Sequence, residues 1–390
     1  MRRVLFLVKS YSTHNRQNAL CVEEVAKCMT ANNYCVDYLS YEFSLITNQP
    51  HLYPCYIKKK STGLYYKIYK LFHIPIENNN LVTAYYNSLK RLIKHNTYDV
   101  IIAVINPPET AEAVYRIKKE YPHLNFILYE IDPNSNRYKI NRSIKEKLWH
   151  HFSTKWEKKI YSKADTIIHM KTHKNHYSAE EFQRFRCKSL YLDIPNFIPA
   201  NLPLMEHSNN GSTKLLYAGA FYPKLREPNY LFNLIDHISR KVTISFDVFT
   251  GNRMKNRLQN FANNNKCITI HDEISQQELM YEIAKADILV SIGNKESDFL
   301  PSKTIMYMST GKPIIHLYSD LNDVSLKYYK HYPMVLLIDQ RKEADNDLYY
   351  KVISFLEHVK DKPLIKFEYM NKFLVENTPE YSAKKIMEKI

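Results

Sequence analysis

The chain has 390 residues, 45% of them hydrophobic and 24% charged, which is long enough for two hydrophobic cores and lacks the compositional bias of a disordered protein. Only 6 glycines are present, which argues against a phosphate site built from a glycine-rich loop. The 6 cysteines form no Cys-x-x-Cys pair, which predicts reduced thiols in a cytoplasmic protein. The formal net charge is +15, and residues 1–198 carry 30 Lys and Arg against 17 Asp and Glu, so we expect this half to face an anionic partner.

The N-terminal half alternates short apolar runs with helical patterns. The first run, Val4–Lys9, is too short for a leader or a membrane span, and no small-residue cleavage site follows it, so we interpret it as a buried strand. Further strands are expected at Tyr34–Leu39, Tyr98–Ile105, Asn125–Ile131 and Thr166–Met170. Continuous apolar strands that alternate with helices predict a parallel sheet covered on both faces.

The same alternation resumes after a linker marked by prolines. Asp193–Pro199 and the polar stretch Leu202–Thr213 interrupt the pattern and predict a domain boundary. Expected strands then follow at Lys214–Ala218, Thr243–Thr250, Cys267–His271, Asp287–Ile292 and Pro313–Leu317. Expected helices lie at Asn229–Ile238, Met254–Asn263, Gln276–Ala284 and Thr304–Ser309. The predicted fold class is α/β, with two Rossmann-like parallel-sheet domains that face each other across a cleft, where ligands would bind at the carboxyl ends of the strands.

Five stretches of the sequence resemble one enzyme family. They are DIPNFIP at 193–199, KLLYAGAFYPKLREP at 214–228, FDVFTGN at 246–252, ESDFLPSKTIMYMSTGKPII at 296–315 and the C-terminal ENTPEYSAKKIMEKI. Together they resemble the glycosyltransferases of GT-B fold, specifically the retaining family 4, also called glycosyl transferases group 1. The resemblance implies an acceptor-side domain at residues 1–198, a nucleotide-sugar donor domain at 199–375, and a terminal helix at 376–390 that crosses back to the first domain.

The stretch at 301–315 has the residue types that a leaving diphosphate requires. Negative charge grows on the diphosphate as the glycosidic bond breaks, and a lysine or arginine beside a helix N-terminus can neutralise it without a metal ion. The resemblance implies a diphosphate-binding set of Gly219, Lys224, Arg226, Ser302, Lys303 and Thr304. Of the two basic residues in the loop after Gly219, we prefer Lys224.

The family usually has two glutamates separated by seven residues in this region, and this chain departs from that pattern. The two positions are Asp298 and Met306 here. We expect Asp298 to contact the sugar, whereas a thioether cannot accept the strong hydrogen bonds that ribose hydroxyls donate to the second acid. Three alternatives stay open: ribose is held otherwise, the donor is unusual, or catalysis is lost. The other nucleotide-binding residues that the resemblance implies are Gly251, Asn252 and Ile274.

Polar residues at strand ends of the N-terminal half are candidates for the acceptor side. They are His14, Asn15, Asn106 and Glu109. Asp132 follows another strand, where the family often has a His-Asp pair, and we predict that it polarises an acceptor hydroxyl or holds the transferred sugar. Asp-Pro-Asn is also an ordinary turn signal, so both interpretations stay open. The predicted catalytic residues are Asp132 and Asp298.

Two segments, Lys58–Phe72 and Lys145–Lys159, interleave basic and aromatic residues. Such segments suit an anionic membrane surface, and a solvated basic face is the alternative. Nucleic acid is not expected as a partner, because no recognised binding motif accompanies the charge. His169, His173 and His176 lack the cysteine or acid that would complete a zinc site, so we expect no metal.

The sequence therefore predicts a cytoplasmic glycosyltransferase of EC class 2.4 that acts in polysaccharide biosynthesis, with docking on the inner membrane face as a hypothesis. It is expected to transfer a sugar from a UDP- or GDP-linked donor to a glycan or a lipid-linked saccharide, with anomeric retention and without a cofactor. The alternatives are a catalytically degenerate protein that binds a partner, and an epimerase that acts on UDP-sugars.

Overall fold

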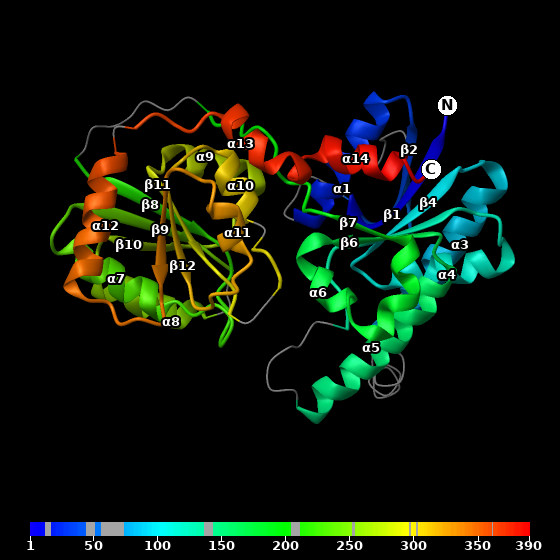
Figure 1. Cartoon of the computed structure of the whole chain (residues 1–390), viewed down its shortest axis with the longest axis horizontal. Helices are drawn as coiled ribbons and strands as arrows, with labels where there is room; N and C mark the ends of the chain where they lie inside the picture. The colour runs from blue at the N-terminus through cyan, green and yellow to red at the C-terminus, as the bar shows by residue number, and fades with distance from the viewer. Residues whose placement is uncertain are drawn as a thin grey trace. The chain divides into compact units, whose positions relative to one another are not determined.

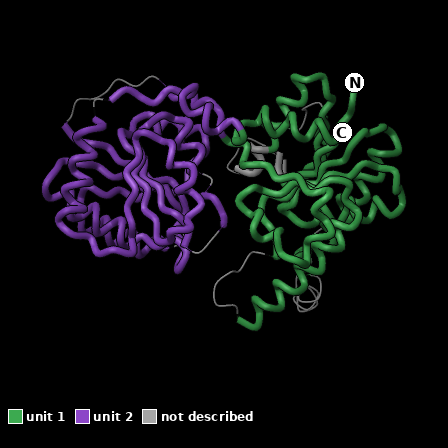
Figure 2. The backbone as a smooth tube through the Cα atoms, in the orientation of Figure 1, with its two compact units in different colours: residues 1–196, 376–390 green, residues 197–375 purple. Residues whose placement is uncertain are grey.

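The computed structural model describes residues 1–11, 17–43, 51–55, 74–135, 143–203, 211–251, 254–295, 298–301, 303–360 and 362–390. The chain divides into two compact units (Figure 2). Unit 1 consists of residues 1–196 and 376–390, and unit 2 consists of residues 197–375. Each unit has its own sheet; unit 1 has a hydrophobic core on each face of its sheet, and unit 2 has a core of its own.

Unit 1 is built on a seven-stranded sheet with the order β3-β2-β1-β4-β5-β6-β7, in which all neighbours run parallel. Its strands are β1 (Arg3–Tyr11), β2 (Cys35–Phe43), β3 (Leu52–Pro54), β4 (Val100–Ile105), β5 (Phe126–Glu130), β6 (Thr166–Met170) and β7 (Ser189–Leu192). Every residue of β4, β5 and β6 is buried. Burial on both faces explains why these strands are continuous apolar runs in the sequence.

Alternate residues of the central strand β1 face opposite sides of this sheet. Val4 and Phe6 pack in a core with α1 (Gln17–Ala31) and α14 (Pro379–Met387). Leu5 and Leu7 pack in the other core, on the side covered by α3, α4 and α5 (Figure 1). These three helices span Asn79–His95, Glu109–Glu120 and Ile144–Lys163. The period of two along the strand thus divides its side chains between two helical layers.

The C-terminal helix belongs to unit 1 although unit 2 precedes it in the chain. Helix α14 begins after Thr378, whose side chain accepts a hydrogen bond from the N–H of Tyr381, and Pro379 occupies the first turn, where a missing N–H costs nothing. Its Ala383 and Ile386 are fully buried against the core that contains α1. The end of the chain therefore completes the core of the first unit.

Unit 2 contains a six-stranded parallel sheet with the order β10-β9-β8-β11-β12-β13. Its strands are β8 (Thr213–Ala218), β9 (Ile244–Phe249), β10 (Ile268–His271), β11 (Ile288–Ile292), β12 (Ile314–Tyr318) and β13 (Val335–Asp339). Its helices are α7 (Asn229–Ser239), α8 (Lys255–Asn264), α9 (Gln276–Lys285), α10 (Lys303–Ser309), α11 (Ser325–Tyr329), α12 (Asn346–Val359) and α13 (Phe367–Leu374). Apolar residues of α7 and α12 pack in one core with the sheet.

The strand order places a switch point in each sheet. In unit 1 the chain proceeds outward from β1 in one direction and from β4 in the other, and in unit 2 it does so from β8 and β11. The loops after these two strands diverge to opposite faces, which leaves a crevice at the carboxyl edge where ligands of open α/β sheets bind. The strand order therefore places the candidate ligand-binding crevice of unit 2 at the loops after β8 and β11.

The predicted α/β class with two parallel sheets is confirmed, with local differences. The strands β3, β7 and β13 are absent from the sequence-based prediction, and none of the three is fully buried. A short edge strand that is partly exposed lacks the continuous apolar run by which the buried strands were recognised. Short helices and 3-10 turns in unit 1 lie at Lys171–His173, Lys174–Tyr177 and Glu180–Lys188, and a further 3-10 turn, Val375–Asn377, begins at the last residue of unit 2. No helix in the described ranges combines the length and apolar character needed to span a bilayer.

Gly311, which follows α10, generates a prediction about the stability of unit 2. Its φ is +73°, and its carbonyl accepts a hydrogen bond of 2.9 Å from the N–H of Ile365. A Cβ at this position would lie 2.3 Å from the carbonyl oxygen of Ile365. We therefore expect Gly311→Ala to lower the free energy of unfolding by about 1 kcal/mol for the left-handed backbone and by about 1–3 kcal/mol more for the clash. Urea denaturation measures both.

Gly211 is the matched control for this substitution. Its φ is +70°, but a Cβ there would meet no atom within 4 Å. Gly211→Ala should therefore cost only the backbone contribution. Equal losses in the two variants would show that the contact with Ile365 does not matter.

Candidate functional site

The loops after β8 and β11 are tied together at the switch point of unit 2. The Nη2 of Arg226, in the loop after β8, donates a hydrogen bond of 2.7 Å to the Oδ1 of Asn294, just after β11. The amide of Asn294 in turn donates to the carbonyl of Phe299 at 2.9 Å, within the segment that leads to α10. One guanidinium therefore connects the two sides of the crevice.

Arg226 is fixed in place and keeps one donor unused. Its backbone pairs with Tyr222 in both directions, at 2.8 and 3.1 Å, and its Nη1 donates to the carbonyl of Ala220 at 3.3 Å. Its Nε is buried and has no hydrogen-bond partner among the described residues. Lys224, by contrast, is exposed at the tip of the turn with a φ of +67°. The geometry favours Arg226 over Lys224, contrary to our preference from the sequence.

Gly219 directly follows β8 and lies beside Tyr217 and Arg226. Its N–H donates to the carbonyl of Phe249 at 3.0 Å, which continues the pairing of β8 with β9. A Cβ on Gly219 would lie 3.1 Å from the hydroxyl oxygen of Tyr217 and 3.6 Å from the Nη1 of Arg226. The absence of a side chain therefore leaves room for the hydroxyl of Tyr217, whereas the distance to the guanidinium group would be an ordinary contact.

Lys303, the first residue of α10, is a second candidate cation for the donor site, besides Arg226. Desolvation by the surrounding protein lowers its pKa to about 8, against the attraction of Glu273, which acts to raise it. Glu273 lies in the loop after β10, and its Oε2 would be 3.7 Å from a Cβ on Gly251, which follows β9. The predicted residues Gly251 and Lys303 are thus linked through Glu273, an acid that the sequence did not single out.

Helix α10 is anchored to the sheet on its buried side. The hydroxyl of Tyr307 accepts a hydrogen bond of 3.1 Å from the N–H of Ala218, at the end of β8. Thr304 is fully buried, and its hydroxyl lies 3.4 Å from that of Ser325. Thr304 therefore has a packing role, with its hydroxyl turned toward α11.

Met306 lies against the start of α9. Its side chain is 6% exposed, and its sulfur accepts a hydrogen bond of 3.3 Å from the Nε2 of Gln276. Gln276 follows Ser275, which forms a capping box with Glu278, and the predicted residue Ile274 is half-buried just before it. The Ser-x-x-Glu pattern marks this helix start in the sequence, so Gln276 was recognisable as the first residue of a helix, although its contact with Met306 was not.

The buried side chain of Asp323 packs against the loop after β11. A Cβ on Gly293 would lie 1.5 Å from the Oδ2 of Asp323, so the carboxylate occupies the space of a missing side chain. The other oxygen of Asp323 accepts the N–H of Ser325 at 2.8 Å. His316 links this acid to β11, with its Nε2 3.4 Å from Asp323 and its Nδ1 3.2 Å from the hydroxyl of Ser291. None of these four polar residues was predicted to be part of a site.

In unit 1, the candidate residues at the strand ends have different environments. Asn106 is exposed after β4 with a φ of +121°, a backbone conformation that few residues other than glycine adopt. Asp132 is exposed after β5, with its Oδ1 3.7 Å from the Nε2 of the buried His173. Glu109 is buried, and its carboxylate accepts the N–H groups of Glu77 and Asn78 at 2.8 Å each. Glu109 thus holds a loop, which does not favour a direct contact with an acceptor.

Several predicted site residues cannot be placed. His14, Asn15, Asn252 and Ser302 lie outside the described residues. Asp298 is half-buried in the short segment before α10.

A cluster of buried polar groups lies behind Asp132. The Oε2 of Glu130 accepts hydrogen bonds from the hydroxyl of Tyr161 at 2.6 Å and from the hydroxyl of Tyr177, and lies 3.0 Å from the Nδ1 of His169. Glu157 is also buried and accepts the N–H of Ser135 at 2.9 Å. Burial, followed by the charge of nearby Glu130, raises the pKa of Glu157 well above its ordinary value.

The three histidines at 169–176 have separate partners. His169 contacts Glu130, His173 lies near Asp132, and the Nε2 of His176 is 2.9 Å from the hydroxyl of Ser135. The three imidazoles therefore contact different partners and do not converge on one point.

No protein-family model matches the chain, and no curated protein sequence matches it significantly. Solved structures match it over its whole length. Sucrose-phosphate synthase from Thermosynechococcus elongatus has a TM-score of 0.67 at 12% identity and covers 100% of this chain and 98% of that one. WaaG, a glycosyltransferase involved in lipopolysaccharide biosynthesis, has a TM-score of 0.60 at 11% identity, with coverage of 98% and 99%.

A third similar structure, UDP-GlcNAc 2-epimerase from Methanocaldococcus jannaschii, has a TM-score of 0.58 at 11% identity and covers 100% of both chains. Identities this low show the fold alone. The chain has the GT-B fold, which confirms the fold predicted from the sequence.

The buried Glu157 generates a prediction about pH. Because its pKa is raised in the folded state, the folded protein binds more protons than the unfolded chain at pH values above the ordinary 4.5 of this carboxyl. The stabilising contribution is present below that pH and is lost as pH rises. Relative to Glu157→Gln, the wild type should lose up to about 1.4 kcal/mol of unfolding free energy per pH unit in this window. Denaturant unfolding from about pH 5 to about pH 8 measures the difference.

The exposed Glu357 on α12 is the control, since Glu357→Gln removes a carboxyl that remains in contact with water. Its stability curve should run parallel to that of the wild type. Parallel curves for Glu157→Gln and the wild type would contradict the prediction.

Proposed function

We propose that the chain is a glycosyltransferase that moves a sugar from a UDP- or GDP-linked donor to a glycan or lipid-linked acceptor, with retention of the anomeric configuration. The observation that carries the proposal is the anchored guanidinium of Arg226 at the switch point of unit 2, which keeps a buried donor unpaired among the described residues. A diphosphate oxygen is a suitable acceptor for this donor, because charge-assisted hydrogen bonds to phosphate are strong.

Arg226 and Lys303 supply the charge that the leaving group requires. Breakage of the glycosidic bond leaves a second negative charge on the terminal phosphate of the nucleoside diphosphate, and cations held in position before the reaction stabilise it without reorganisation. The lowered pKa of Lys303, about 8, means that burial disfavours its charge until an anion binds. We propose that these two side chains, rather than a metal ion, neutralise the diphosphate.

The remaining site residues receive roles by their positions. Asp132 is exposed at a strand end of unit 1, and we propose that it binds the acceptor hydroxyl or the transferred sugar. Gln276 contacts Met306 through its amide nitrogen. We propose that its amide oxygen accepts the hydrogen bonds of the ribose hydroxyls. A retaining transfer needs no separate base, so the leaving diphosphate itself can take the acceptor proton.

A binding experiment with substituted cations tests the donor site. Isothermal titration with UDP and GDP at pH 7, below the pKa of Lys303, should show binding of one of them to the wild type. Arg226→Met and Lys303→Met should each weaken that binding by about 10- to 100-fold, as expected for the loss of one charged hydrogen bond. Lys266→Met, which removes an exposed cation just before β10 at the amino edge of the same sheet, should leave it unchanged.

Other outcomes separate the alternatives. Binding with inversion at C2 of a UDP-sugar and no transfer would indicate an epimerase. Absence of binding to any nucleotide or nucleotide sugar would indicate the degenerate, partner-binding alternative. An equal loss in Lys266→Met would show that the effect is one of net charge only.

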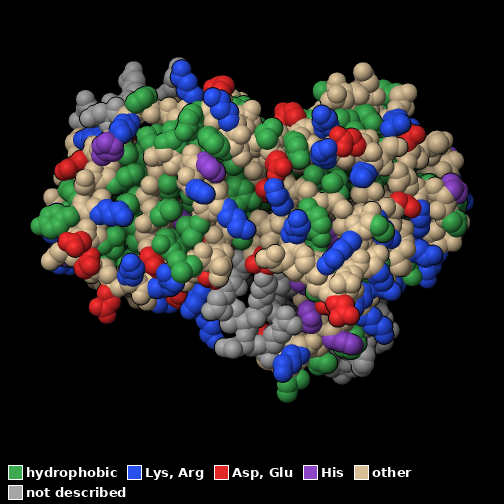
Figure 3. Space-filling model, in the orientation of Figure 1, with side chains coloured by type: hydrophobic (Ala, Val, Ile, Leu, Met, Phe, Trp, Pro, Cys, Tyr) green, Lys and Arg blue, Asp and Glu red, His purple; other side chains and the backbone are tan. Residues whose placement is uncertain are grey.

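We further propose that α5 docks unit 1 on an anionic membrane. Ile144 and Leu148 lie one turn apart at the start of this helix and are 80% and 50% exposed. Lysines at 145 and 147 flank them, and Figure 3 shows basic and hydrophobic side chains beside each other at the lower tip of unit 1, where α5 begins. Apolar side chains among lysines suit the boundary between headgroups and acyl chains. The other predicted segment, Lys58–Phe72, lies outside the described residues.

Vesicle co-sedimentation tests this docking. The wild type should bind vesicles that contain phosphatidylserine and not vesicles of phosphatidylcholine alone. Substitution of both Ile144→Ser and Leu148→Ser should reduce the bound fraction at least about threefold, because each leucine-sized side chain contributes about 1.5–3 kcal/mol on burial. Leu321→Ser, at a residue of unit 2 that is 63% exposed, is the control. Equal binding to both vesicle types would refute the docking.

A further inference from the structure

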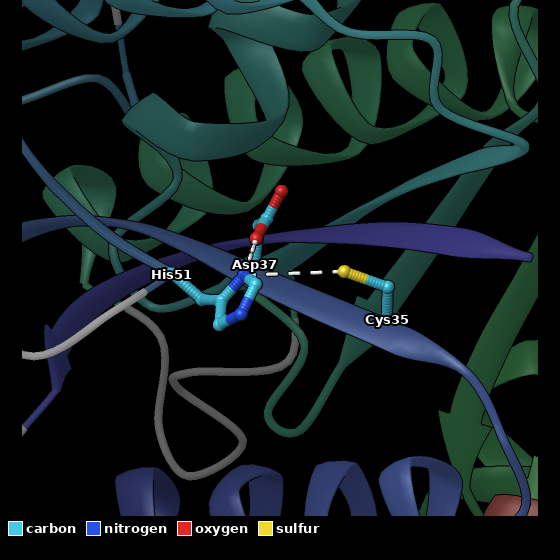
Figure 4. A group of neighbouring side chains, drawn as sticks. All are labelled: Cys35, Asp37 and His51. Atoms are coloured by element: carbon cyan, nitrogen blue, oxygen red, sulfur yellow. Dashed lines mark hydrogen bonds and ion pairs between the residues drawn. The ribbon is translucent and has the colours of Figure 1, made fainter. Parts of the chain in front are cut away.

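A second cluster of chemically reactive side chains lies at the opposite edge of the unit 1 sheet from Asp132. Cys35 is the first residue of β2, Asp37 lies two residues further on the same face, and His51 directly precedes β3 (Figure 4). Because β2 and β3 are parallel neighbours, their amino ends bring these residues together. The three side chains are thiol, carboxylate and imidazole, the donor types that zinc prefers.

The distances in the cluster approach those of a metal site. The Oδ1 of Asp37 lies 2.7 Å from the Nδ1 of His51, and the Sγ of Cys35 lies 3.9 Å from the same nitrogen. One ligand atom from each of the three residues fits within 4.8 Å. Tetrahedral zinc with ordinary bond lengths would separate such atoms by about 3.3–3.6 Å. Changes of at most about 1.2 Å in the separations between these atoms would therefore bring all three into coordination.

The carboxylate is held by groups that leave one oxygen directed at the cluster. Asp37 is fully buried, and its Oδ2 accepts hydrogen bonds from the Nε of Arg3 at 2.8 Å and from the hydroxyl of Tyr98 at 2.9 Å. Arg3 is itself held by the Oδ1 of Asn96 at 2.7 Å. Donors behind a ligating carboxylate fix its orientation and balance its charge, as around known metal sites. The Oδ1 that faces His51 is the oxygen available for a metal.

The site is also accessible from solvent. The side chain of His51 is 51% exposed, and Cys35 is partly exposed. A cation can therefore enter without opening the core, and a water molecule can occupy a fourth position. Exposure of the imidazole also leaves it free to turn by the small amount that coordination requires.

We propose that Cys35, Asp37 and His51 bind one zinc ion, with water as the fourth ligand, and that the ion fastens β3 to β2 at the edge of the sheet. Zinc displaces the thiol proton of Cys35, which leaves to solvent, and the proton on the Nδ1 of His51 is replaced by one on its Nε2, so that the imidazole binds as a neutral ligand. The thiolate ligand selects zinc over magnesium and calcium, which prefer oxygen. The proposal does not depend on the donor site, which lies in unit 2.

Metal binding to the full-length protein tests this assignment. The chain is freed of metal with a chelator, and Zn²⁺ is titrated while bound metal is counted by mass spectrometry. Co²⁺ in place of Zn²⁺ reports a thiolate ligand by its charge-transfer absorption. The wild type should bind one ion per chain, and its melting temperature should rise on addition of Zn²⁺, because a ligand that binds only the folded state stabilises it.

Cys35→Ser and His51→Ala should each weaken Zn²⁺ binding at least about tenfold and abolish the cobalt–thiolate absorption or shift it. Cys187→Ser, which removes an exposed thiol elsewhere in unit 1, should bind as the wild type does. Failure of the wild type to bind a stoichiometric ion, or full binding by His51→Ala, would overturn the proposal. The wild-type measurement decides whether zinc binds even where a variant folds poorly. If all of these variants still bind nucleotide, the zinc site is independent of the donor site.

Discussion

The hydrogen bond from Arg226 to Asn294 is the contact on which the candidate donor site depends. These residues are 68 positions apart, in loops that leave the sheet in opposite directions at its switch point. Without a connection between them, each loop would be positioned only by its own strand. Hydrogen bonds to a charged donor contribute about 1.5–3 kcal/mol, enough to keep one arrangement of the two loops dominant. The same guanidinium then provides the unpaired donor that a diphosphate could use.

Buried carboxyl groups fix the conformation of several loops in this chain by accepting hydrogen bonds from their backbone N–H groups. The chain has only 6 glycines, and its site loops are instead held from inside by acids that accept backbone N–H groups. Asp323 holds the N–H of Ser325, Glu109 holds those of two residues before α3, and Glu157 holds that of Ser135. A buried polar group is costly unless it is hydrogen-bonded, so these acids are stable only where the loop supplies its donors. Each loop and its acid therefore stabilise one another.

The departures from the expected site have a common physical origin. Lys224 and Arg226 are two residues apart, and nothing local distinguishes them, but the turn they share directs one outward and the other to Asn294. Glu109 was expected to face an acceptor because it follows a strand, yet it turns inward to the start of α3. In both cases the side chain follows the nearest unsatisfied hydrogen-bonding groups, and those belong to segments distant in sequence.

The sequence by itself determined the α/β class, the alternation of strands and helices, and the place of the candidate donor site in the second half of the chain. Those features depend on periodicity and on short motifs, which local residue order encodes. The tertiary structure decided which members of the motifs meet: Arg226 with Asn294, Met306 with Gln276, and Asp323 with the space above Gly293. It also brought Cys35 and Asp37 of β2 together with His51, the residue before β3. Such contacts arise only when strands distant in sequence become neighbours in a sheet, so no local pattern announces them.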